Sequence, residues 1–146
     1  MANTGHDWGS FAFVQRAGGD WDADTLGDDS AAAVSDAITV DTKSAMLVGM
    51  AFTEDNTGAV VANSVTVAVL GTFDDTTYED APGLANAQVG NPMKFKITPV
   101  QADTVYTQFS IDPRDYNLFK IAALNESGQQ LTISCKIKTA DVPVAS

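Results

Sequence analysis

Alternation of apolar and polar residues with a period of two is the feature that most constrains the fold of this chain. Near the C-terminus, Leu131, Ile133, Cys135 and Ile137 alternate with polar residues. Similar alternation occurs at 38–42, 65–70, 93–98 and 105–111. Because successive side chains of a strand point to opposite faces, each stretch predicts a strand with one apolar side. No stretch supports a helix longer than one turn, so the pattern predicts an all-β fold.

Turn signals separate these stretches and indicate how many strands to expect. Clusters of Gly, Pro, Asp and Asn lie at 54–58, 82–83, 90–92, 112–115 and 125–128. Their spacing is typical of β-sandwiches and barrels. We predict an antiparallel β-sandwich of about eight strands, with jelly-roll or Greek-key winding. Alternation alone leaves an up-and-down barrel open as the alternative. The apolar run 45–52, with Gly49 inside it, predicts a central strand buried on both faces.

The first 35 residues differ in composition from the rest. They hold one short apolar run, 11–14, followed by a stretch rich in Gly and Asp that disfavours strands and helices. We predict an extended N-terminal arm and acidic loop with one short strand over residues 1–35. An ordered edge strand at 10–16 followed by a loop is the alternative. The sandwich domain then spans 36–141, and residues 142–146 form a tail that we expect to fray.

Composition excludes several function classes. Nineteen acidic against eight basic residues give a formal charge of −11, which repels phosphate backbones, so we expect no nucleic-acid partner. The single Cys135 cannot form an internal disulfide, and a single histidine, His6, removes most catalytic triads and metal centres. We therefore expect no enzyme activity and no cofactor. The polar N-terminus predicts no secretion signal, and the longest apolar run is too short to span a bilayer, so we expect cytoplasmic synthesis and no membrane partner.

Two acidic groups are candidate sites. Asp20, Asp22 and Asp24 stand at alternate positions, like the start of a calcium loop of the EF-hand type. Thr25 and Ala31 occupy the places of the required Gly and Glu, so a solvated loop or a partner-facing arm is the favoured interpretation. A calcium site that uses Asp28 or Asp29 stays open as an alternative.

The second acidic group consists of Asp74 and Asp75, with Glu79 and Asp80 nearby. Paired carboxylates of this kind can catalyse glycoside hydrolysis. Both pairs lie in turn-like segments, where Asp is common for conformational reasons. We therefore predict no catalytic residue, and interpret these carboxylates as turn formers.

Aromatic residues of the N-terminal region are the candidate partner-binding residues: Trp8, Phe11, Phe13 and Trp21. An aromatic side chain on an extended arm can anchor into a groove of another subunit. Two other interpretations of the tryptophans stay open. One is burial against the sandwich of the same chain. The other is a sugar-stacking platform shared with Tyr78, Tyr106 and Tyr116.

The stretch from about 37 to 141 resembles the small β-sandwich proteins that decorate or cement the heads of tailed bacteriophages. The resemblance is carried by the strand 64–70 that runs into the acidic turn 72–78, by 107–112 leading through Pro113 to 116–121, and by the closing strand 131–137. The resemblance covers about two-thirds of the chain and lies in the pattern of strands and turns. The N-terminal arm matches no element of such proteins.

This resemblance implies a structural function. The protein would bind the outside of an assembled capsid and stabilise contacts between major capsid subunits, as a homo-oligomer in which a trimer is favoured. Its location would be the surface of the virion. Two alternatives stay open: another virion β-domain, in a tail, fibre or baseplate, and a carbohydrate-binding module.

Overall fold

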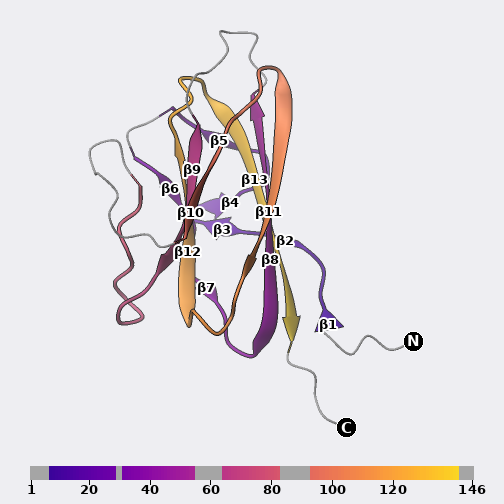
Figure 1. The fold of residues 1–146 in the computed structure, drawn as a ribbon, viewed down its shortest axis with the longest axis vertical. Helices are drawn as coiled ribbons and strands as arrows, with labels where there is room; N and C mark the ends of the chain where they lie inside the picture. The colour runs from indigo at the N-terminus through magenta and orange to yellow at the C-terminus, as the bar shows by residue number, and fades with distance from the viewer. Residues whose placement is uncertain (1–6, 29–30, 55–63, 83–92, 142–146) are drawn as a thin grey trace.

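The computed structural model describes residues 7–28, 31–54, 64–82 and 93–141 of the chain. Within these ranges the chain forms thirteen β-strands and no helix, so none of the described segments is a helix that could cross a membrane. Two antiparallel sheets lie face to face (Figure 1). The predicted all-β sandwich is confirmed, and over the described strands the pairing forms two main sheets and a small hairpin instead of one closed barrel.

The first sheet is built on three long strands in the order β13-β8-β11. They are β8 (Lys43–Glu54), β11 (Asp103–Ile111) and β13 (Leu131–Asp141). Three short strands pair with the other edge of β13: β1 (Asp7–Trp8), β2 (Ala12–Phe13) and β5 (Asp24–Leu26). The β8–β11 register is continuous from Met46 to Glu54, so side chains on the two strands alternate in step.

The second sheet has the order β10-β9-β12-β6, with β7 also paired to β12. Its strands are β6 (Ala33–Val34), β7 (Ile38–Thr39), β9 (Val65–Gly71), β10 (Lys94–Ile97) and β12 (Leu118–Asn125). A separate hairpin joins β3 (Gln15–Arg16) to β4 (Gly19–Asp20). Gly18, with φ of 78°, takes the left-handed conformation that this tight turn needs.

The core lies between the two sheets. Alternate residues of β8, β9, β12 and β13 point into it, and the largest fully buried side chains include Trp21, Phe52 and Phe119. Cys135 is buried there as well, on the apolar face that the alternation predicted. Burial of this apolar surface is the main stabilising contribution to such a fold.

The prediction that 45–52 is buried on both faces is wrong. In β8, Met46, Val48 and Phe52 are buried, whereas the intervening Leu47 and Ala51 are only partly buried. The strand with both faces buried is β9, in which every residue from Val65 to Leu70 is buried. The reason is that neighbouring chain segments cover the outer face of β9 and leave much of the outer face of β8 open.

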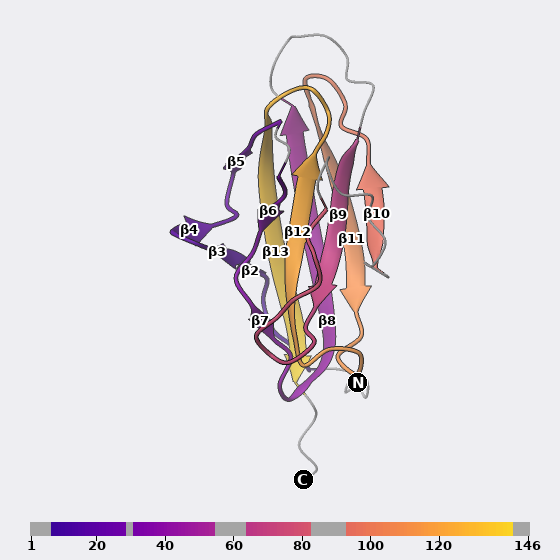
Figure 2. The same ribbon diagram turned by 90° about the vertical axis from the view of Figure 1, so that its left-hand side faces the viewer.

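The N-terminal region, expected as an extended arm with one short strand, pairs with the first sheet through β1, β2 and β5 and contributes Val14, Trp21 and Leu26 to the core. The main chain of Trp21 bonds to both Val14 and Cys135: its N–H donates to the Val14 carbonyl and its carbonyl accepts from the Cys135 N–H, each at 2.9 Å. Figure 2 shows the β3–β4 hairpin projecting away from the sandwich, whereas β2 and β5 pair with β13. Strands of two or three residues are too short for period-two alternation to reveal them. The predicted tail 142–146 and His6 lie outside the described residues.

Candidate functional site

Three of the four aromatic residues predicted to bind a partner gather on the outer face of the first sheet. Strand pairing sets Trp8 opposite Ala140, and Phe13 opposite Lys136. Lysines of β13 contact these rings: Lys136 Nζ lies 4.7 Å from the Phe13 centroid. Lys138 Nζ lies 5.0 Å from the centroids of both Trp8 and Phe11. Cation–π attraction of this kind holds each lysine over a ring.

Beside these rings lies a shallow groove, called here the aromatic groove, with a volume of about 820 Å³. Its floor is the outer face of β8, where Gly49 and Ala51 leave little side chain above the sheet. One wall is formed by Phe11, Phe13 and Lys136, and the other by residues of β11 around Tyr106. The register explains this arrangement, because Ala51 pairs with Tyr106 on one side and with Ser134 on the other.

Aromatic side chains that line the groove or lie beside it are exposed to solvent. Tyr106 is 78% exposed, Phe11 43% and Trp8 37%. Tyr106 was not among the predicted partner-binding residues, although it was considered as part of a sugar platform. A sequence signal for it exists: it is the aromatic residue on the otherwise polar face of the 105–111 alternation. A hydroxylated ring in such a place offers a large apolar contact area with a polar tip.

Trp21 does not join this surface. It is 1% exposed and belongs to the core of its own chain, which is the second interpretation that the sequence left open. Its main-chain bonds to Val14 and Cys135 fix the strand segment so that the indole ring packs among the buried residues. In this fold Trp21 is therefore structural, and it is unavailable to a partner.

The alternating aspartates do not assemble into a metal site. Arg16 holds Asp24 with two hydrogen bonds, from Nε at 2.5 Å and from Nη2 at 3.1 Å. Asp22 lines the aromatic groove, and Asp28 accepts a hydrogen bond from the Gly128 N–H at 3.1 Å. Over the ranges that the structure describes, no three His, Cys, Asp or Glu side chains converge to hold a metal ion. Asp29 lies outside those ranges.

The second acidic group shapes its own loop. Residues 72–78 form a turn, called here the Phe73 turn, in which Asp74 Oδ1 accepts hydrogen bonds from the Thr76 and Thr77 N–H groups. These bonds lower the pKa of the Asp74 carboxyl below its usual range. Asp75 accepts a hydrogen bond from Asn117 Nδ2 at 2.8 Å, and Glu79 accepts one from the Gly71 N–H at 2.8 Å. Asp74 thus stabilises the turn, which is the conformational role that the sequence indicated, whereas Asp75 connects the turn to Asn117 and Glu79 bonds back to Gly71.

The remaining candidate residues lie apart from the groove. Lys120 Nζ lies 4.4 Å from the centroid of the Tyr78 ring. The ring of Tyr116 packs against that of Phe119, with the two centroids 5.7 Å apart. Tyr78 and Tyr116 line a different cleft, of about 780 Å³, which the Phe73 turn helps to form. Burial raises the pKa of the Cys135 thiol to about 12, so the thiolate needed of a nucleophile is absent near neutral pH.

No family model matches the chain, and no curated protein matches it. Among solved structures, one match comes from work on Bacillus endospore appendages, described as a novel family of disulfide-linked pili. The alignment has a TM-score of 0.45 and 8% sequence identity, and covers 98% of this chain and 96% of that chain. A likeness of this degree carries no functional argument.

Proposed function

We propose that this chain is a structural protein of a tailed-bacteriophage head, which binds the outside of the assembled capsid and stabilises contacts between major capsid subunits. The observation that carries the proposal is the aromatic groove. Exposed rings such as Tyr106 and Phe11, around a floor of small residues, form a surface suited to burying a segment of another protein. The partner class comes from the sequence resemblance to decoration proteins.

The architecture suits a rigid contact that many copies make at once. Long strands of the first sheet hold the groove, and strand pairing fixes both of its walls, so little ordering entropy is lost when a partner binds. Each copy needs only a modest affinity, because many copies on a lattice act together through their high local concentration. A decoration layer makes two kinds of contact, with the capsid and between copies, and the groove supplies a site for one of them.

Purified protein added to undecorated phage heads tests this function. We expect saturable binding at a fixed stoichiometry and a higher temperature of head disruption. Tyr106→Ala should weaken the affinity for the head by about tenfold or more, since a buried aromatic anchor contributes about 2 kcal/mol. Val100→Ser is the matched control, because Val100 is 50% exposed and lies outside the groove. Absence of binding to every head lattice tried would overturn the proposal.

A carbohydrate-binding module is the second candidate function. The specific observation in its favour is the exposed ring of Tyr106 beside the groove, since flat aromatic surfaces stack on sugar rings. The aromatic set proposed from the sequence is divided, however, because Trp21 is in the core and Tyr78 and Tyr116 line another cleft. Glycan-array binding that Tyr106→Ala abolishes would favour this candidate, and an array without hits would remove it.

A tail, fibre or baseplate domain is the third candidate, and it uses the same groove for a different partner. Its location separates it from a decoration protein. Labelled antibody against the purified chain, viewed on virions by electron microscopy, should mark the head if the first proposal holds. Label confined to the tail would replace that proposal with this candidate.

A further inference from the structure

The most exposed large apolar side chain among the described residues is Phe73, which is 91% exposed. It stands on the Phe73 turn, which is closed by its own hydrogen bonds. The Phe73 N–H donates to the Thr77 carbonyl at 2.8 Å, and Thr72 Oγ1 donates to the same carbonyl at 2.9 Å. Asp74 completes the closure by accepting from two N–H groups. The turn therefore presents an aromatic ring to solvent on a fixed main chain.

Such a ring is suited to be an anchor. Aromatic side chains dominate interface energetics, and a contact made by a preorganised loop loses little conformational entropy. The turn also has a definite charge. Asp74, Asp75 and Asp80 are exposed acidic residues on or next to it, and hydrogen bonding to the turn favours the ionised form of Asp74. A partner site for this turn must therefore accept a phenyl ring and carry positive charge beside it.

The aromatic groove has both properties. Its floor at Gly49 and Ala51 is open, and Phe11 and Tyr106 stand on either side. Its charged residues are Lys136, the neighbouring Lys138 and Asp22, which gives a positive balance in a chain whose formal charge is −11.

The two lysines are also available to a partner's carboxylates. Across the described ranges, the salt bridges are those of Arg16 with Asp24, Lys43 with Asp141, and Arg114 with Asp112. Lys136 and Lys138 instead contact aromatic rings. An acidic turn that approaches the groove would therefore meet ammonium groups that form no salt bridge among the described residues.

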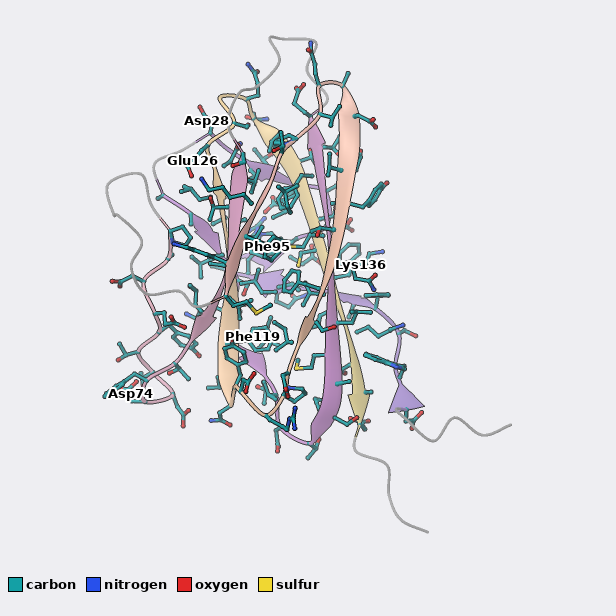
Figure 3. All side chains as sticks on the ribbon, viewed as in Figure 1. Asp28, Asp74, Phe95, Phe119, Glu126 and Lys136 are labelled. Carbon is teal, nitrogen blue, oxygen red and sulfur yellow. The ribbon has the colours of Figure 1, made fainter. Side chains whose placement is uncertain are left out.

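Within one molecule the turn cannot reach the groove. Figure 3 shows Asp74, on the turn, and Lys136, at the groove, on opposite sides of the sandwich. A contact between them must join two copies, and it pairs two different surfaces. Such a heterologous contact leaves one free turn and one free groove on every pair, so it continues into a ring or an open chain.

We propose that the Phe73 turn of one copy binds in the aromatic groove of the next copy. The Phe73 ring lies over Gly49 and Ala51, and the acidic residues of the turn face Lys136 and Lys138. This names the occupant of the groove, and so it rests on the proposed function's statement that the groove binds protein. It does not need the capsid, and it links neighbouring copies head to tail.

Sedimentation velocity of the purified chain, from about 10 µM to about 1 mM, tests the proposal. We expect wild-type protein to form species larger than a dimer as the concentration rises. Phe73→Ser removes the anchor, and Ala51→Glu places a carboxylate on the groove floor; each should weaken self-association by about tenfold or more. Val100→Ser should associate like wild type. Circular dichroism of every variant checks the fold, and Tyr106→Ala replaces Ala51→Glu if that variant is not folded.

Mixing the two variants gives the sharper result. Phe73→Ser keeps an intact groove, and Ala51→Glu keeps an intact turn, so a mixture can form one contact and no more. We expect a heterodimer that does not grow, at concentrations where each variant alone is monomeric. A mixture that stays monomeric, variants that associate like wild type, or a wild-type chain that is monomeric throughout would each overturn the proposal. Binding to phage heads is measured separately, so failure of the capsid proposal is distinguishable from failure of this one.

Discussion

The two outer faces of the sandwich are built from similar strands but differ in solvent exposure: the outer face of the second sheet is covered, and that of the first sheet is open. On the second sheet, the outward residues Ala68, Leu70 and Ala122 are at most 2% exposed, beneath a set of partly buried residues. These covering residues are Ala32, Val34, Tyr78 and Ala81. On the first sheet, the outward residues of β8 stay partly exposed, and Tyr106 beside them is 78% exposed.

Local chain segments cause this difference. After β9 the chain folds back, with Glu79 N–H donating to the Gly71 carbonyl at 2.9 Å and with Lys120 over the Tyr78 ring. The N-terminal strands pair with β13 and do not cover β8. Phe11 and Phe13 therefore form a wall of the groove and leave its floor on β8 open. A face that the chain covers itself contributes to stability. A face that it leaves open, with rings around it, is where binding is expected.

The largest expected contrast is between the two tryptophans. Trp21→Ala should lower the free energy of unfolding by about 3–5 kcal/mol, because it leaves a large cavity in the core. Trp8→Ala, at the open face, should cost about 1 kcal/mol, because its ring is partly solvated already. Urea denaturation followed by circular dichroism measures both. Similar losses for the two variants would contradict the division into core and binding surface.

A matched pair of leucines compares the faces directly. Leu70→Ala, on the covered face, should lower the free energy of unfolding by about 2–4 kcal/mol, since Leu70 is 2% exposed. Leu47→Ala, on the open face, should cost about 1 kcal/mol or less. Thermal unfolding of the two variants under identical conditions decides this. If Leu47→Ala were the more damaging variant, the first face would be covered in solution.

The buried thiol of Cys135, on the core face of β13, should make the stability of the protein depend on pH. Burial raises the pKa of the Cys135 thiol from 9.0 to about 12, so the unfolded chain loses this proton first as pH rises. The contribution of the protonated thiol to the free energy of unfolding is therefore fully present below pH 9 and is lost between pH 9 and 12. We expect wild type to lose about 1 kcal/mol more than Cys135→Ala between pH 8 and pH 10. Parallel pH profiles for the two proteins would show that the thiol is solvated.

The smallest expected effect is at the lysine between the rings. Lys138→Ala removes an ammonium 5.0 Å from both Trp8 and Phe11, which should cost about 0.5–1 kcal/mol. It should also change Trp8 fluorescence, measured in a Trp21→Phe background so that a single indole reports. Lys94→Ala is the control, as Lys94 lies in β10 of the other sheet. An unchanged Trp8 spectrum would indicate that the ring and the lysine are apart in solution.

Sequence patterns predicted the long strands well, and their limits have physical causes. The buried face was predicted correctly for the strands at 131–137 and 105–111, because alternation reports which side of a strand faces the core. The same rule misjudged 45–52, because small residues such as Gly49 and Ala51 read as apolar and lie on an open face. Of the four partner candidates, Phe11 and Phe13 line the groove and Trp8 lies beside it. Trp21 does neither, since its burial depends on main-chain bonds to Val14 and to Cys135, 114 positions away.

Hydroxyl-radical footprinting of the wild-type chain at low and high concentration tests the central claim most directly, since it reports the solvent exposure of individual aromatic residues. The account predicts that Phe73 and Tyr106 become protected together as the concentration rises, whereas Phe95 of β10, which lines neither the aromatic groove nor the cleft beside the Phe73 turn, keeps its reactivity. Protection that is confined to other surfaces, or Phe73 and Tyr106 equally reactive at both concentrations, would contradict it.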